Sequence, residues 1–174
     1  MHRGSIISRI TTRCVGLALL IGALPALSQT IAITETSVTV DGHEIQLPQS
    51  EAAFEAAIGG VPVRNEELAN EHSDRVVSWP NLGLVAFSNP RNRKVHAVEL
   101  LVSRPPYWND VLFGGTLSVS GHVITPTTPA SDLARFGFSD AGWAWEWRRG
   151  CLYVLAITNG ETIRSIEIGR DQDK

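Results

Sequence analysis

The sequence predicts an α+β fold built from two tandem strand–strand–helix–strand–strand repeats, in which helices pack on one face of an antiparallel sheet. Two observations carry this prediction. The halves of the chain match over their last thirds at a constant offset of 68 residues, and each half shows the same order of hairpin, helix and hairpin signals. The repeats are expected at about 31–104 and 111–170, within a single domain at 29–174.

Each half opens with a short alternating strand and a tight turn, at residues 38–43 and 117–122. The turn dipeptide Asp41-Gly42 is a strong two-residue hairpin signal, because both of its positions need positive φ. Ser120-Gly121 is a weaker form of the same signal. The alternation of apolar residues in these strands predicts that one sheet face is buried.

A helix signal follows each hairpin. In the first half Ser50 is placed to cap a helix that begins at Glu51 and ends at Gly59, with Pro62 beyond it. In the second half Ser131 is placed to cap a shorter helix that ends at Gly137.

The last third of each half carries the clearest match. Trp79 aligns with Trp147 and Glu99 with Glu167, while the turn at 91–92 aligns with Asn159-Gly160, another strong hairpin dipeptide. Residues 104–110, which contain two consecutive prolines, are expected to join the halves as a stiff extended connection.

The N-terminus has the three parts of a secretory signal peptide, expected at residues 1–28. Arg3, Arg9 and Arg13 precede a 13-residue apolar run, and small residues follow it before Gln29. The run is shorter than the about 20 residues that span a bilayer, so no stable membrane insertion is expected after cleavage. For a Gram-negative source this predicts a periplasmic or secreted protein.

Charge and cysteine content narrow the function classes. Without the signal, 12 basic and 18 acidic residues remain (15 − 3 against 18), which argues against a nucleic-acid partner. Cys14 leaves with the signal, so Cys151 has no partner for an intramolecular disulfide. Its apolar context predicts a buried small side chain in a central strand.

Two segments resemble an uncharacterised family of exported bacterial domains. In that family a helix ends in a Leu-Gly-x-Pro-x-Arg turn and a later strand opens with Trp-Asp-x-Leu-Gly. The matching segments are residues 58–64 and 79–84, with an additional glycine in the first and Pro80 in place of aspartate in the second. The resemblance implies export and a fold, and no activity. At the level of fold, the duplication is also similar to the tandem repeats of the β-lactamase inhibitor protein and of small outer-membrane assembly lipoproteins.

The most distinctive local motif is Trp143-Ala144-Trp145-Glu146-Trp147. Because side chains alternate along a strand, its three indoles are expected on one face, either in the core or as a platform for a partner. Trp147, which aligns with Trp79, is expected in the core. The predicted binding residues are the other two tryptophans of the motif and two aromatics of the connection: Trp143, Trp145, Tyr107 and Trp108.

Catalytic and metal-binding signatures are missing from the sequence. His43 and His122 follow the equivalent turns, but no further ligand spacing completes a metal site, so both are expected to be solvated. His96 and Glu99 stand at odd separation on one strand, which predicts opposite faces. No Gly-x-Ser-x-Gly, Ser-x-x-Lys or His-Glu-x-x-His motif occurs. No catalytic residue, metal or cofactor is predicted.

The sequence therefore favours a non-catalytic periplasmic or secreted binding module, inhibitor-like or immunity-like, whose partner is a protein of the cell envelope. One alternative is an envelope-associated accessory protein that contacts peptidoglycan or an outer-membrane assembly. Another is a small hydrolase with a dispersed site. The identity of the partner and the oligomeric state are left open.

Overall fold

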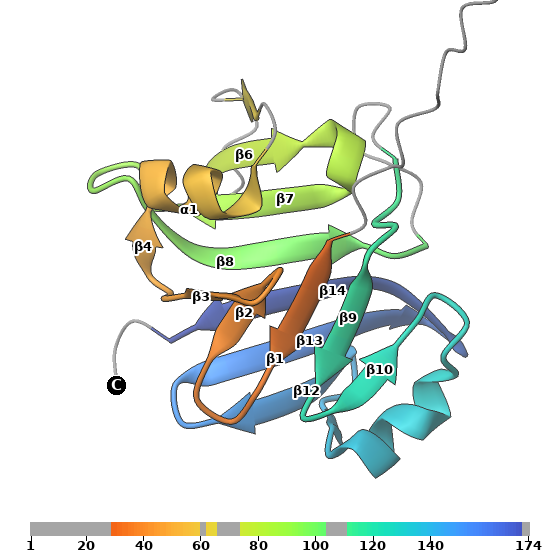
Figure 1. Cartoon of the computed structure of the whole chain (residues 1–174). Coiled ribbons are helices and arrows are strands. Elements are labelled where there is room, and N and C mark those ends of the chain that lie inside the picture. Colours follow the sequence, from red (N-terminus) through yellow and green to blue (C-terminus); the bar gives the residue numbers. More distant parts are fainter. Residues whose placement is uncertain (1–28, 60–61, 66–73, 104–110, 172–174) are drawn as a thin grey trace, which may run out of the picture.

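The protein is mostly β, with two sheets that face each other (Figure 1). The computed structural model describes residues 29–59, 62–65, 74–103 and 111–171, and strands make up 52% of them. The predicted signal peptide lies outside these residues. The prediction of an α+β fold with helices covering one sheet face is wrong, because a second sheet covers that face.

Sheet A has five strands in the order β10-β9-β1-β2-β3. It contains both predicted hairpins, which turn at Asp41-Gly42 (φ 49° and 81°) and Ser120-Gly121 (φ 49° and 82°), as two-residue turns with positive φ require. Its central strand β1 pairs antiparallel with β2 and parallel with β9. The strands are β1 (Thr30–Ile33), β2 (Val38–Val40), β3 (His43–Ile45), β9 (Thr116–Val119) and β10 (His122–Ile124).

Sheet B is larger and has the order β11-β12-β13-β14-β8-β7-β6-β5, with the two-residue β4 paired to β8. Every pairing in it is antiparallel. The strands are β4 (Gln49–Ser50), β5 (Val63–Asn65), β6 (Arg75–Trp79), β7 (Leu84–Ser88), β8 (Lys94–Leu101), β11 (Ser139–Asp140), β12 (Ala144–Arg149), β13 (Leu152–Asn159) and β14 (Thr162–Arg170).

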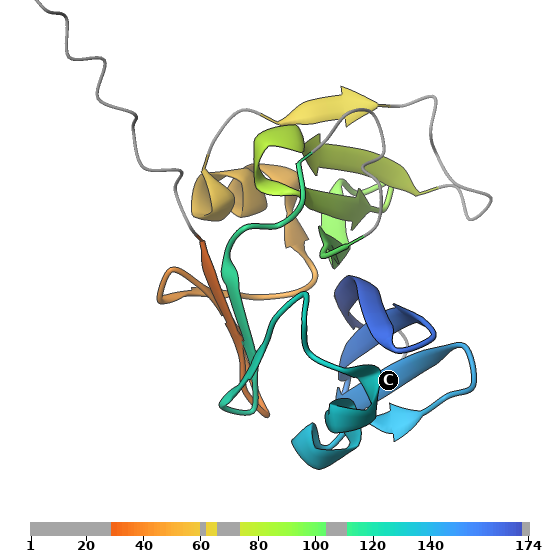
Figure 2. The same cartoon turned by 90° about the vertical axis from the view of Figure 1, so that its right-hand side faces the viewer.

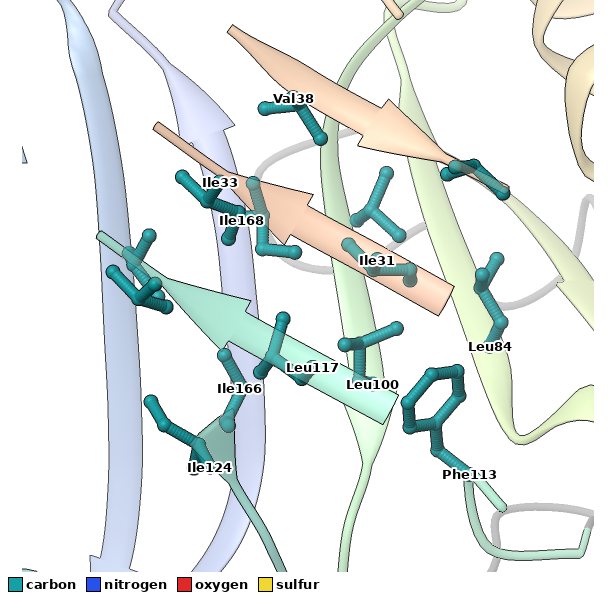
Figure 3. Close-up of a cluster of buried hydrophobic side chains, with 14 of the residues drawn as sticks. Ile31, Ile33, Val38, Leu84, Leu100, Phe113, Leu117, Ile124, Ile166 and Ile168 are labelled. Carbon is teal, nitrogen blue, oxygen red and sulfur yellow. The ribbon is translucent and has the colours of Figure 1, made fainter. Parts of the chain in front are cut away.

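The main core fills the space between the sheets (Figure 3). Ile31, Ile33 and Leu117 project from sheet A toward Leu100 and Ile166 of sheet B, and all five are at most 2% exposed. Turned by 90°, the molecule shows β1 and β9 as one layer and the strands of sheet B as the other (Figure 2). Burial of each such aliphatic side chain stabilises the fold by about 1.5–3 kcal/mol.

The helices are short, and α1 and η3 each contribute buried side chains to this core. Helix α1 (Glu51–Ile58) is capped by Ser50, whose Oγ accepts from the amide of Ala53 at 3.3 Å, and it buries Phe54 and Ile58. The second predicted helix is a 3₁₀ segment, η3 (Ala130–Phe136), which ends at Gly137 as predicted and buries Leu133. A third short segment, η1 (Pro80–Leu82), links β6 to β7.

The pairing between the two halves of sheet B is symmetric. Glu99 of β8 lies directly opposite Glu167 of β14, its match at offset 68, while Val98 pairs with Ile168 and Leu100 with Ile166. In sheet A, β2 and β9 flank β1 and run in opposite directions. Two copies of one motif related by a local two-fold axis through the Glu99–Glu167 pair would produce this pattern.

Candidate functional site

Trp143 is the most exposed large apolar side chain among the described residues, with 64% of its surface open to solvent. It precedes β12 in the tight connection from β11. Gly142 has φ of 85° there, and its amide donates to Oδ1 of Asp140 at 2.7 Å. The indole therefore sits at the end of a hairpin whose backbone is held by local hydrogen bonds.

The other two tryptophans of the motif face the core. Trp145 and Trp147 lie opposite Ala156 and Val154 of β13, both of which belong to the main core. Trp147 is fully buried, as predicted, and Trp145 is half-buried against the core cluster. Of the predicted binding residues, Tyr107 and Trp108 lie outside the described residues. The exposed aromatic surface that the structure describes is therefore centred on Trp143.

A groove of about 440 Å³ opens between the sheets at the other end of β12. One wall comes from sheet A, from the β1–β2 turn, β3 and the residues that follow β3. The other wall comes from sheet B, from the β12–β13 turn and the end of β14. The lining residues are Glu35, Thr36, Ser37, Val38, Glu44, Ile45, Gln46, Leu47, Arg149, Gly150, Cys151, Leu152 and Arg170.

The charges in this groove are divided between its walls. Glu35 and Glu44 belong to the sheet A wall, and Arg149 and Arg170 to the sheet B wall. Nε of Arg149 lies 3.7 Å from Oε1 of Glu35, a loose pair between exposed side chains, and its guanidinium also lies 5.4 Å from the Trp147 ring centroid. Nη1 of Arg170 donates to the carbonyl oxygen of Leu47 at 3.4 Å.

The predicted position of Cys151 is wrong. The residue lies in the turn between β12 and β13 and is half-buried on the groove wall. Gly150, with φ of 58°, directly follows the last residue of β12 and starts the turn. Strand β13 therefore begins only at Leu152, and the Cys151 thiol lies outside the strand. The glycine itself was the sequence signal for the turn, because glycine adopts positive φ without steric cost.

The outer face of sheet B carries a second cluster of titratable side chains. The Tyr153 hydroxyl donates to Oε1 of Glu167 at 2.8 Å, and Glu167 faces Glu99, which is 7% exposed. Burial and the Glu99 carboxylate raise the pKa of Glu167, although the Tyr153 hydrogen bond opposes the shift. Burial and the Glu167 carboxylate raise the pKa of Tyr153.

A glycine makes the Tyr153–Glu167 contact possible. Gly169 lies opposite Tyr153 in the β13–β14 register, and a Cβ at that position would lie within 2.3 Å of the tyrosine ring. The ring therefore lies across β14 and brings its hydroxyl to Glu167, two residues along that strand. The Arg148 guanidinium covers the ring from β12, 5.4 Å from its centroid.

The three histidines among the described residues lie on three different strands. His43 and His122 are exposed, as predicted, and the His122 ring stacks on Phe136 with centroids 4.6 Å apart. His96 lies 3.4 Å from Asp74, at a bulge where the β7–β8 register shifts. Because of this bulge, strict alternation does not hold between His96 and Glu99. His96 interacts electrostatically with Glu167 and opposes the rise in the Glu167 pKa.

Within the described ranges, no group of three or more His, Cys, Asp or Glu side chains is placed to hold a metal ion. Among the described residues, no helix combines the length and the apolar character needed to cross a membrane.

Comparison with known proteins gives a family and no activity. No curated protein and no solved structure matches the chain. A family model described as a domain of unknown function, DUF7738, matches residues 30–134, which include all of sheet A, α1 and strands β4 to β8. The chain therefore belongs to the DUF7738 family of domains of unknown function.

Proposed function

We propose that the protein is a non-catalytic binding module of the periplasm or the extracellular medium, which acts through a protein surface centred on Trp143. The inhibitor-like or immunity-like form, which masks an envelope-directed enzyme, is the one we favour. The observation that carries the proposal is the 64% exposure of the Trp143 indole at the end of a hydrogen-bonded hairpin.

An exposed tryptophan on a rigid support is a typical centre of a protein interface. Indoles combine a large apolar area with few rotatable bonds, and they are enriched among the residues that dominate binding energy. Because the hairpin already holds the indole outward, little ordering entropy is lost on binding. The fold itself needs no indole at this position, since the core contacts of β12 come from Trp145 and Trp147.

The test is site-specific photo-crosslinking in cell-envelope extract, with a photoreactive phenylalanine analogue at position 143 and, as a control, at exposed Val123 of β10. We expect one discrete adduct from position 143 and none of that size from position 123. The captured partner should then bind Trp143→Ala about 30-fold more weakly than wild type, which corresponds to about 2 kcal/mol.

Stability separates a binding role from a structural one. Trp143→Ala should leave the free energy of unfolding within about 0.5 kcal/mol of wild type. Trp147→Ala, at the fully buried position, should lose about 3–5 kcal/mol. Equal adducts from both photoreactive positions, or an unchanged affinity of Trp143→Ala for the captured protein, would refute the proposal.

A further inference from the structure

The groove between the sheets lies at the far end of β12 from Trp143 and is a separate site. Its base is apolar, because Val38, Ile45, Leu47 and Leu152 line it and are at most 8% exposed. Its volume of about 440 Å³ is in the range of ligand-binding pockets. An occupant would thus place apolar groups on the base and polar groups at the charged walls.

One edge of the groove offers backbone hydrogen bonds. In the two-residue hairpin of β2 and β3, Val40 and His43 form the hydrogen-bonded pair next to the turn, so the next pair, Thr39 and Glu44, is not hydrogen-bonded to each other. The amide and carbonyl of Glu44 therefore point away from β2, at the outer edge of sheet A. Among the described residues, no hydrogen bond reaches the backbone of Glu44 or Gln46.

The opposite wall offers a guanidinium. In the described parts of the chain the Arg170 guanidinium has no carboxylate partner, and its one hydrogen bond is the donation to the Leu47 carbonyl. Arg149 stands on the same wall, with its loose contact to Glu35. Planar guanidinium groups bind carboxylates through two parallel hydrogen bonds, and such a pair is stronger where water is partly excluded.

From this arrangement we propose that the groove binds the C-terminal end of an extended peptide. The peptide adds a strand to the free edge of β3, its last apolar side chain rests on the base of the groove, and its terminal carboxylate pairs with Arg170 and Arg149. Strand addition uses the free edge of β3, and the terminal carboxylate supplies the acidic partner that the Arg170 guanidinium lacks among the described residues. The site does not depend on Trp143 or on the function proposed for it.

Three probes separate the parts of this proposal. The first is a pool of N-acetylated tetrapeptides with Val, Leu or Ile at the C-terminus and a free carboxylate. The second is the same pool with C-terminal amides. The third is hexanoate, which has the carboxylate and an apolar chain but no peptide groups. Each is titrated into the ¹⁵N-labelled protein to millimolar concentration, and backbone amide shifts are followed.

The free-acid pool should shift the amides of Glu44 and Gln46, and its affinity should exceed those of the amidated pool and of hexanoate about tenfold or more. Arg170→Gln should remove the preference for the free acid, while Arg164→Gln, on the same strand but outside the groove, should keep it. Absence of shifts at Glu44 and Gln46, equal binding of acid and amide, or hexanoate as strong as the peptides would each overturn the proposal. Loss of the Trp143 crosslink would leave it unaffected.

Discussion

Two tryptophans four residues apart have opposite environments, and the reason lies in single residues. Trp147 sits within β12 opposite a core valine, whereas Trp143 precedes the strand, after a glycine with positive φ. Alternation places side chains on a face only while a residue remains in the strand ladder. The Trp-x-Trp-x-Trp motif thus predicted the buried residue correctly, and the boundary of the strand decided the exposed one.

Glu99 and Glu167 are two like charges held directly opposite each other at the junction of the two halves of sheet B. Three further titratable groups surround Glu167: Tyr153 on β13, His96 on β8, and Asp74, which precedes β6. Because the pKa of folded Glu167 is raised above its ordinary value of 4.5, the folded state binds more protons than the unfolded state between the two values. Stability should therefore fall as pH rises through that window.

Glu167→Gln tests this, because it keeps the shape of the side chain and removes its titration. Wild type should lose stability relative to Glu167→Gln as the pH rises above about 4.5. Urea denaturation at a series of pH values measures the free energy of unfolding of both proteins. Glu161→Gln, an exposed carboxylate in the β13–β14 turn, serves as the control. A difference that does not change with pH would mean that Glu167 is not the group responsible.

Among the elements, those defined by local chemistry were predictable. The hairpin at Asp41-Gly42 and the helix after Ser50 are present, because turn and cap residues act within a few positions of themselves. The hairpin predicted at Asn159-Gly160 is also present, but it turns one residue later, at Gly160 and Glu161, because Asn159 still pairs with Thr162 as the last residue of β13. Strand β1 was not predicted. It has four residues, and its partners β2 and β9 come from different halves of the chain, so no local signal marks its place at the centre of sheet A.

The same limit applies to the candidate sites. The exposure of Trp143 was predicted, whereas the groove was not, because its walls come from residues 35–47 and 149–170, more than 100 positions apart. Likewise Tyr153 and Gly169 gain their roles only through the β13–β14 register. Residue spacing does not reveal contacts that sheet pairing creates.

A buried carboxylate at the start of helix α1 links the helix to sheet B. Glu51, in its first turn, is 9% exposed and accepts from Oγ of Ser88 at 2.6 Å. Nε of Arg75 lies 3.1 Å from the same oxygen, close enough for an ion pair although not aligned as a hydrogen bond. The carboxylate thus joins the start of α1 to β6 and β7.

Glu51→Gln should lower the free energy of unfolding by about 3 kcal/mol, because it removes the buried carboxylate charge that lies 3.1 Å from Nε of the buried Arg75. Urea denaturation at neutral pH measures the loss. Ser50→Ala, which removes only the helix cap, should cost about 1 kcal/mol. If both variants lose the same amount, Glu51 contributes no more than capping does.

At the scale of the whole molecule, the main core is shared by the two halves. Strand β1 joins hairpins from both halves into sheet A, and β8 and β14 join the two halves of sheet B. The family match at 30–134 ends within η3, before β11 to β14 begin. Those strands supply a large share of the core that sheet A covers: Trp147, Leu152, Val154, Ala156, Ile163, Ile166 and Ile168.

A fragment of residues 29–134, which corresponds to the family match, should therefore not fold alone. The inner face of sheet A would lose the core side chains of β12 to β14 that it covers. Strand β8 would lose its partner β14 and become an exposed edge of sheet B. We expect poor dispersion in its ¹H–¹⁵N spectrum and no cooperative thermal transition, whereas residues 29–174 should unfold in one transition. A cooperatively melting fragment with a dispersed spectrum would show that the first 105 matched residues form an independent unit, to which strands β11 to β14 are an addition.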